Sequence, residues 1–133
     1  MKILILDGQG GGVGHNILEA LAAAKFDLEN VVVVGTNAVA TANMIKGYNV
    51  KAASGEQAAI FNSNRVDVII GPVGIVMPNA MLGEITPAMA EAVSSCPGKI
   101  VLIPMNKCHA TIVGIANKKR QELIAEAITE VLA

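Results

Sequence analysis

Hydrophobic residues along this chain fall into short runs that are separated by glycine-rich or polar segments. Six runs are typical of strands, at residues 2–6, 31–34, 50–53, 66–70, 100–103 and 111–115. Several of them are apolar without alternation, as expected for strands that are covered on both faces. The pattern predicts an α/β fold, a single doubly wound, mostly parallel sheet in a Rossmann-like three-layer sandwich.

The segments between these runs carry helix signals. Helices are predicted over residues 14–24, 37–46, 54–62 and 86–95, and from residue 117 onward. Ser54 with Gln57 fits a capping box, Thr86 and Pro87 fit an N-cap followed by proline, and Asn117 fits a cap for the last helix. We see no internal repeat or linker, so residues 1–133 are predicted to form one Rossmann-like domain.

The first hydrophobic run passes directly into a glycine-rich loop. Asp7 is followed by five glycines within residues 8–14. Glycine permits positive φ and leaves no Cβ in the way, so that backbone NH groups can approach a phosphate. The dipole of the following helix favours an anion at the same place. The loop therefore predicts a nucleotide or dinucleotide site, in which Asp7 orients the loop through backbone NH groups.

Ligands of doubly wound sheets bind at the carboxyl ends of the strands, where the strand order reverses. We expect this point between the first and fourth strands, with the loop after the fourth strand acting either as the second wall of a cleft or as an ordinary tight turn. The predicted cofactor-binding residues are Gly8, Gln9, Gly10, Gly11, Gly12, Val13, Gly14, Thr36, Asn37, Gly71, Pro72, Gly74, Asn106 and Lys107. The expected ligand is a small phosphate-containing molecule, NAD(P) or another nucleotide.

Individual residues leave several interpretations open. Thr36 and Asn37 follow the second strand and fit either contact with a ribose or 2′-phosphate, or helix capping. No acidic residue stands there to bind the ribose of NAD, and no arginine is nearby in sequence to select NADP. His15 fits either a functional role, as a phosphate contact or proton carrier, or simple packing or solvent exposure. Cys108 and His109 are adjacent, so their side chains would face opposite sides of a strand and do not suggest a catalytic pair.

The spacing Gly8-x-x-x-Gly12-x-Gly14 resembles the fingerprint of the short-chain dehydrogenase/reductase family. The resemblance implies that these three glycines approach a pyrophosphate. The catalytic Tyr-x-x-x-Lys of that family is missing, because Lys51 follows Tyr48 one position too early. Reductase chemistry of that type is therefore not predicted.

Two further resemblances bear on function. Residues 10–16 resemble the deviant phosphate loop of Mrp/MinD-type ATPases, but Gly10, His15 and Asn16 stand where that family has two lysines and a magnesium-binding hydroxyl residue, so ATP hydrolysis is not expected. Over most of its length, the chain looks like a small bacterial family of unknown function. That resemblance is carried by residues 7–12, 34–37, 82–87 and 104–108.

Composition narrows the classes of partner. With 53% hydrophobic and 16% charged residues, some apolar surface is expected to be covered in a homo-oligomer. A net charge of -1 and 2% aromatic residues argue against nucleic acid. Short apolar runs and the lack of a signal-peptide pattern predict a cytoplasmic protein without membrane contact. The two cysteines lack metal-ligand spacing, so no metal site is predicted.

Two function classes remain: a cofactor-linked or ligand-sensing protein, and a structural or assembly protein whose glycine loop serves packing.

Overall fold

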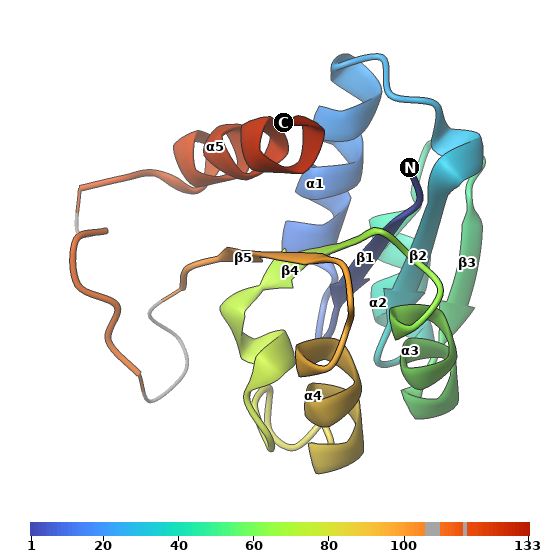
Figure 1. Ribbon diagram of the computed structural model, residues 1–133, viewed down its shortest axis with the longest axis vertical. Coiled ribbons are helices and arrows are strands. Elements are labelled where there is room, and N and C mark those ends of the chain that lie inside the picture. The colour runs from blue at the N-terminus through green and yellow to red at the C-terminus, as the bar shows by residue number, and fades with distance from the viewer. Residues whose placement is uncertain (106–109, 116) are drawn as a thin grey trace.

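A computed structural model describes residues 1–105, 110–115 and 117–133, and within them one five-stranded parallel sheet (Figure 1). The strand order is β3-β2-β1-β4-β5. The strands are β1 (Ile3–Asp7), β2 (Val31–Gly35), β3 (Lys51–Ser54), β4 (Val68–Pro72) and β5 (Lys99–Ile103). The predicted doubly wound α/β sandwich is confirmed.

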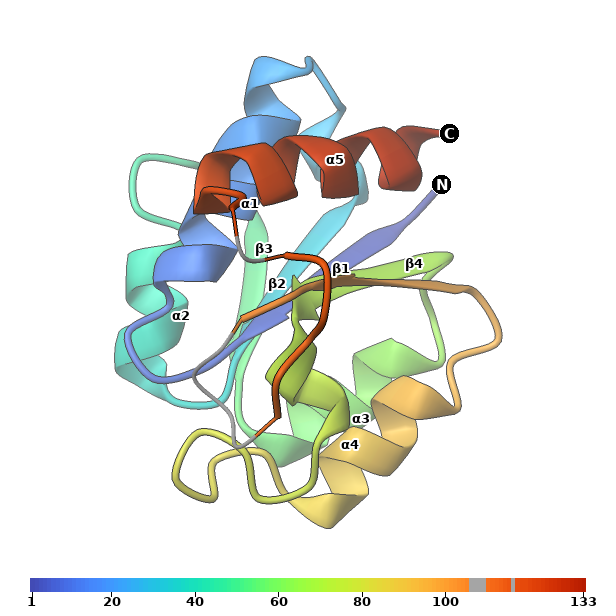
Figure 2. The same cartoon turned by 90° about the vertical axis from the view of Figure 1, so that its left-hand side faces the viewer.

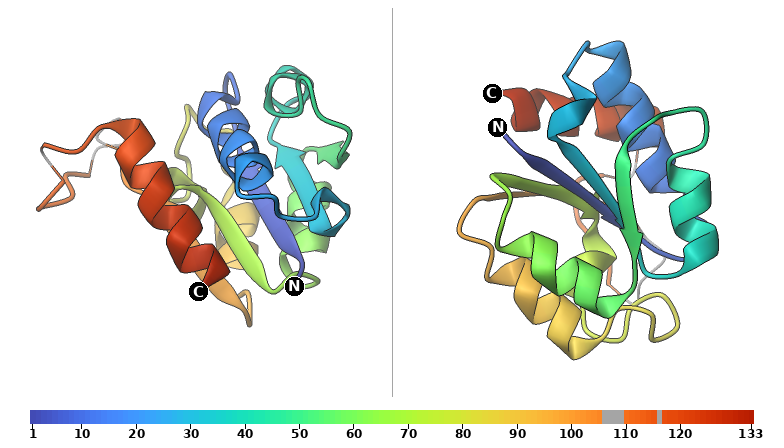
Figure 3. Two further views of the ribbon diagram at one scale, coloured as in Figure 1. Left: turned by 90° about the horizontal axis from the view of Figure 1, so that it is seen from above. Right: turned by 90° about the vertical axis from the view of Figure 1, so that its right-hand side faces the viewer.

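Helices cover both faces of the sheet (Figure 3). Helices α1 (Gly12–Ala23), α2 (Ala38–Met44) and α5 (Arg120–Leu132) pack on one face, and α3 (Glu56–Ser63) and α4 (Pro87–Ser94) pack on the other. Two short 3-10 helices, η1 (Leu28–Asn30) and η2 (Val73–Val76), precede β2 and follow β4. The result is a three-layer sandwich with a separate hydrophobic core on each side of the sheet.

The central strand β1 explains the uninterrupted apolar runs of the sequence. Ile3 and Ile5 belong to the core under α1 and α5, whereas Leu4 and Leu6 belong to the core under α3 and α4. All four are fully buried. Because alternate side chains point to opposite faces, a strand that is covered on both faces carries apolar residues at successive positions, as at residues 3–6.

Several predicted helix boundaries are confirmed. The Thr86 hydroxyl accepts a hydrogen bond from the Met89 NH at 3.1 Å, and Pro87 begins α4. Asn37 caps α2, since its side-chain oxygen accepts from the Ala40 NH at 2.8 Å.

Three local predictions are wrong. Residues 111–115 form no strand: Val113 is 91% exposed, and Gly114 turns the chain with φ 91°. The side chain of Ser54 does not cap α3, which begins after Gly55 at φ 100°; the hydroxyl instead hydrogen-bonds the Thr41 hydroxyl at 2.7 Å. Asn117 does not cap α5, because Lys119 is the residue at that position. At Ser54 a neighbour in the fold, and at residues 111–115 a glycine turn, overrides a short local pattern.

The carboxyl ends of the strands face one end of the molecule. In Figure 2 the loop that leaves β1 and the yellow loop over residues 77–86 meet at this end. No helix within the described residues is both long and apolar enough to span a bilayer.

Candidate functional site at the carboxyl ends of the strands

The strand order reverses between β1 and β4, as the sequence predicts. From β1 the chain winds outward through β2 to β3, and on the other side β4 is followed by β5. Connections that depart in opposite directions leave a crevice beyond the carboxyl ends of the two central strands. The glycine loop lies on one side of this crevice, and the start of η2 lies on the other.

Asp7, the last residue of β1, anchors the glycine loop. Its side chain is only 4% exposed, and its two oxygens accept hydrogen bonds from the NH groups of Gly8 and Gly14, both at 2.7 Å. Burial raises the pKa of Asp7 above its ordinary value of 3.8, while the two NH groups and the charge of Arg120 act in the opposite direction. The prediction that Asp7 orients the loop is confirmed.

Three of the loop glycines are required by packing. A Cβ at Gly8 would lie 2.6 Å from the Met81 sulfur, and one at Gly14 would lie 2.9 Å from Met44 Cγ. Gly11 has φ 72°, which L side chains rarely adopt. All three residues are buried, so the fold itself accounts for glycine at these positions.

The other two loop glycines are exposed, and the fold does not require them. No described atom lies within 4 Å of a Cβ built at Gly10. At Gly12 the nearest atom is Nη1 of Arg120 at 3.8 Å, an ordinary van der Waals distance. Neither residue has a positive φ. The space above them is therefore open to an external group.

Open backbone donors lie at the same place. Within the described residues the NH groups of Gly10, Gly12 and Val13 donate no hydrogen bond; for Gly12 and Val13, the first two residues of α1, this is usual for amides at the start of a helix. The guanidinium of Arg120, at the first position of α5, lies beside Gly12. Amides, helix dipole and guanidinium all favour an anion here.

At the end of β2 the structure brings in a residue from another loop, Glu84. One of its carboxylate oxygens, Oε1, accepts hydrogen bonds from the Thr36 hydroxyl at 2.5 Å, the Gln9 NH at 2.8 Å and the Asn37 side-chain amide at 3.0 Å. These three donors outweigh the effect of partial burial and lower the pKa of Glu84 below 4.5. A negative charge is therefore held beside Gly8 and Gln9 at neutral pH.

The loop that carries Glu84, residues 77–86, has an unusual backbone. Asn79, Met81 and Leu82 all have positive φ, at 69°, 58° and 57°. Residues other than glycine rarely adopt a left-handed backbone conformation, and they keep it only where the surrounding structure holds them. Here the holding contacts are the fully buried Ile85 side chain and the hydrogen bonds of Glu84.

A cavity of about 700 Å³ lies between this loop, the glycine loop and η2. Its lining is mostly apolar and rich in methionine, formed by Gln9, Pro72, Gly74, Met77, Pro78, Asn79, Ala80, Met81, Leu82 and Met105. The volume falls within the range of small-molecule sites in proteins. Gln9, Pro72 and Gly74, from two predicted ligand loops, thus line the same cavity.

In a comparison with protein families, the model described as a domain of unknown function, DUF3842, matches residues 2–133. The chain belongs to the DUF3842 family. Its predicted resemblance to a family of unknown function is thereby confirmed, whereas no comparison supports the resemblance of the opening loop to the short-chain dehydrogenase/reductase fingerprint. No curated protein matches the chain.

In this member of the DUF3842 family, His15 contacts the end of α2 and the residues beside it. Its Nδ1 lies 3.2 Å from the Met44 carbonyl oxygen, its ring centroid is 6.2 Å from that of Tyr48, and its Nε2 is 3.9 Å from Glu19. Of the two interpretations of His15, packing is the one that these contacts favour.

The remaining predicted site residues divide into three groups. Gly71 is a packing glycine, because a Cβ there would meet the backbone of Leu6. Val13 contributes an open NH but buries its side chain in the core beneath α1. Asn106 and Lys107, like Cys108 and His109, lie outside the described residues.

The sequence did not single out Arg120 or Glu84 for this site. Arg120 follows Gly12 by more than a hundred positions, and Glu84 is separated from Thr36 by 48. The segment around Glu84 resembled the family, but no spacing linked it to the glycine loop. The fold brings Arg120 beside Gly12 and Glu84 beside Gly8 and Gln9.

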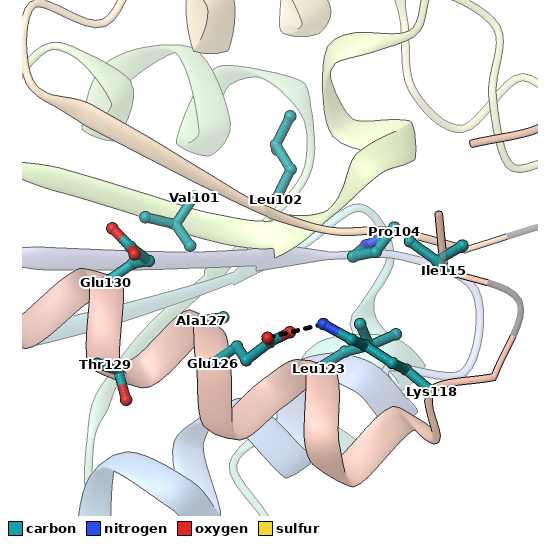
Figure 4. A pocket seen from close by; sticks show the side chains of 10 residues that line it. All are labelled: Val101, Leu102, Pro104, Ile115, Lys118, Leu123, Glu126, Ala127, Thr129 and Glu130. Carbon is teal, nitrogen blue, oxygen red and sulfur yellow. Dashed lines mark hydrogen bonds and ion pairs between the residues drawn. The ribbon is translucent and has the colours of Figure 1, made fainter. Parts of the chain in front are cut away.

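A second cavity of about 420 Å³ lies between β5 and α5 (Figure 4). Val101 and Leu123 contribute apolar walls, and Lys118 Nζ donates to Glu126 Oε1 at 2.8 Å at its edge. Two of its charged side chains, Lys118 and Glu126, already pair with each other. No group of histidine, cysteine or acidic residues within the described part of the chain is suited to hold a metal ion.

Proposed function

We propose that this protein binds a nucleotide or dinucleotide, NAD(P) being the first class to test, with the phosphates at Gly10–Val13. The observation that carries the proposal is the difference among the loop glycines. Gly8, Gly11 and Gly14 are explained by packing, whereas Gly10 and Gly12 have open space where a side chain would stand. A ligand that closely approaches the backbone supplies the missing reason for glycine at these two positions.

The surroundings of the loop support a phosphate-containing ligand. The first amides of α1 and the guanidinium of Arg120 lie at one end of the loop. The apolar cavity beside Gln9 offers room for a flat ring system, and the reversal of strand order is where folds of this class bind ligands. The described residues that line the cavity include no acid, base or nucleophile, so the proposal concerns binding and conformational response and assigns no reaction.

The test is a thermal-shift screen with NAD(H), NADP(H), FAD, coenzyme A, ATP and GTP, followed by titration calorimetry of any ligand that raises Tm. A ligand at one hundred times its Kd stabilises the folded state by about 2.7 kcal/mol. For a domain of this size that is a rise on the order of 10 °C.

Gly12→Ala is the decisive variant. An alanine at the first position of α1 meets only Arg120 at an ordinary distance, so the stability of the ligand-free protein should stay the same or rise by about 0.5 kcal/mol. Its nucleotide affinity should fall at least tenfold, because the methyl group occupies the approach to the amides.

Gly11→Ala is the matched control, one residue away. Its positive φ and the nearby Ala40 carbonyl predict a less stable protein. Normal nucleotide affinity in Gly12→Ala would remove the loop from the binding site. If the wild-type protein binds none of the ligands, the assembly-protein hypothesis gains weight.

A further inference from the structure

We propose that Glu84 accepts a hydrogen bond from the ribose of the bound nucleotide and selects ligands whose 2′-hydroxyl carries no phosphate. This inference rests on the proposed function and adds the chemical class of the ligand. Proteins of this fold that bind NAD usually place an acidic residue at the end of the second strand to accept the 2′-hydroxyl. Here β2 ends at Gly35, and neither Thr36 nor Asn37 is acidic.

The carboxylate of Glu84 reaches this position from a different loop. Its Oε1 atom lies within hydrogen-bond distance of the first two residues after β2 and of the Gln9 NH in the glycine loop. A carboxylate therefore lies beside the end of β2, although no acidic residue follows β2 in the sequence. The residues that would contact a ribose directly, Thr36 and Asn37, are instead used to hold this carboxylate.

Glu84 is held in one orientation by these contacts. All three donors converge on Oε1, whereas Oε2 accepts no hydrogen bond from the described residues. The residue is only partly buried, so solvent and ligand can reach it. An oriented carboxylate with a remaining acceptor oxygen suits a hydroxyl donor and repels a phosphate.

The charges along the glycine loop agree with this orientation of the ligand. Arg120 and the open amides lie at the Gly12 end, and Glu84 lies at the Gly8 end. A nucleotide has the same polarity, with an anionic phosphate on one side of the sugar and hydroxyl groups on the other. The loop can thus bind phosphate and ribose at the same time only in this direction.

The experiment compares ligands that differ only at the 2′ position. Titration calorimetry would measure wild-type affinities for NAD and NADP, and for ADP and GDP against their 2′-deoxy counterparts. A hydrogen bond to a charged group predicts that NAD and the ribonucleotides bind about tenfold or more tightly than their counterparts. Glu84→Gln keeps the shape of the side chain and an acceptor oxygen but removes the charge, and it should abolish the preference for NAD over NADP.

Glu91→Gln, on the exposed surface of α4, controls for the change in net charge and should keep the wild-type preference. If Glu84 only holds the loop in place, Glu84→Gln should lower the affinity for both ligands of each pair by the same factor. That result would overturn the inference. Equal wild-type affinities within each pair would also overturn it while leaving nucleotide binding intact. Absence of binding by any nucleotide would refute the proposed function, and the inference with it. The wild-type comparison needs no variant, so it decides the question even if Glu84→Gln does not fold.

Discussion

The anchoring of the glycine loop by Asp7 predicts the effect of a single isosteric substitution, Asp7→Asn. The carboxylate is 4% exposed and accepts one NH on each oxygen at 2.7 Å. Asparagine fills the same volume but has only one acceptor oxygen, so one of the two NH groups faces an NH₂ group. Leaving a buried donor unsatisfied costs about 1–3 kcal/mol.

Removal of the buried charge opposes part of this loss. Burial raises the pKa of Asp7, which means that the ionised form is disfavoured in the folded protein. We therefore expect a net loss of about 1–2 kcal/mol at neutral pH. With a urea m value of about 2 kcal/mol per molar, the unfolding midpoint would fall by about 0.5–1 M.

Urea unfolding followed by circular dichroism measures this change. Asp67→Asn is the matched control, because Asp67 is exposed and its carboxylate accepts a single backbone NH, that of Lys2, at 2.7 Å. Its free energy of unfolding should stay within about 0.5 kcal/mol of the wild-type value. An Asp7→Asn protein that unfolds at the wild-type midpoint or above it would show that the two NH groups find other acceptors, and the anchoring role would be wrong.

The pH dependence of stability in the wild type and in Asp7→Asn tests the direction of the pKa shift of Asp7. A raised pKa means that the folded state holds the proton more tightly than the unfolded state. The contribution of Asp7 to stability is then greatest below pH 3.8 and declines as the pH rises through the folded-state pKa. Asparagine does not titrate, so the difference in stability between wild type and Asp7→Asn should narrow with rising pH. A widening difference would contradict the direction of the shift.

Two further predictions concern the loop at residues 77–86 and the helix that follows it. Glu84 has a lowered pKa, so its stabilising contribution is present above pH 4.5 and is lost as the pH falls through its folded-state pKa. The urea midpoints of Glu84→Gln and wild type should therefore diverge as the pH rises. This trend is opposite to the one expected for Asp7→Asn and wild type. Thr86→Ala removes the side chain that caps α4 and should lower the free energy of unfolding by about 1 kcal/mol in the same assay, whereas Thr86→Ser should keep most of the wild-type stability.

The layered fold was predictable because its signals are local. The apolar run of β1 reports burial on both faces, and the caps at Asn37 and Thr86 are satisfied by amides three residues away. Where a local signal competed with a contact from elsewhere, prediction failed. Ser54 has the right spacing for a capping box, but its hydroxyl pairs with Thr41 across the fold. Residues 111–115 have strand-like composition, but Gly114 turns the chain.

The candidate site was predictable where its residues directly follow a strand. The glycine loop is continuous in sequence, and Gln9, Pro72 and Gly74 were placed by the rule that ligands bind at the carboxyl ends of strands. Arg120 and Glu84 could not be placed in that way. They reach the loop from a helix start and from a long connection, and their positions follow from side-chain contacts that have no periodic signal in sequence.

The two function classes that the sequence left open make different demands on the same loop, and the structure separates these demands by residue. A loop that serves only helix-strand packing needs glycine where neighbours approach closely or φ is positive, which is true at Gly8, Gly11 and Gly14. Substitutions there would impair folding under either hypothesis and so cannot distinguish between them. Gly10 and Gly12 carry no such requirement, so alanine at these two positions is harmless to a packing loop and harmful only to a loop that binds a ligand.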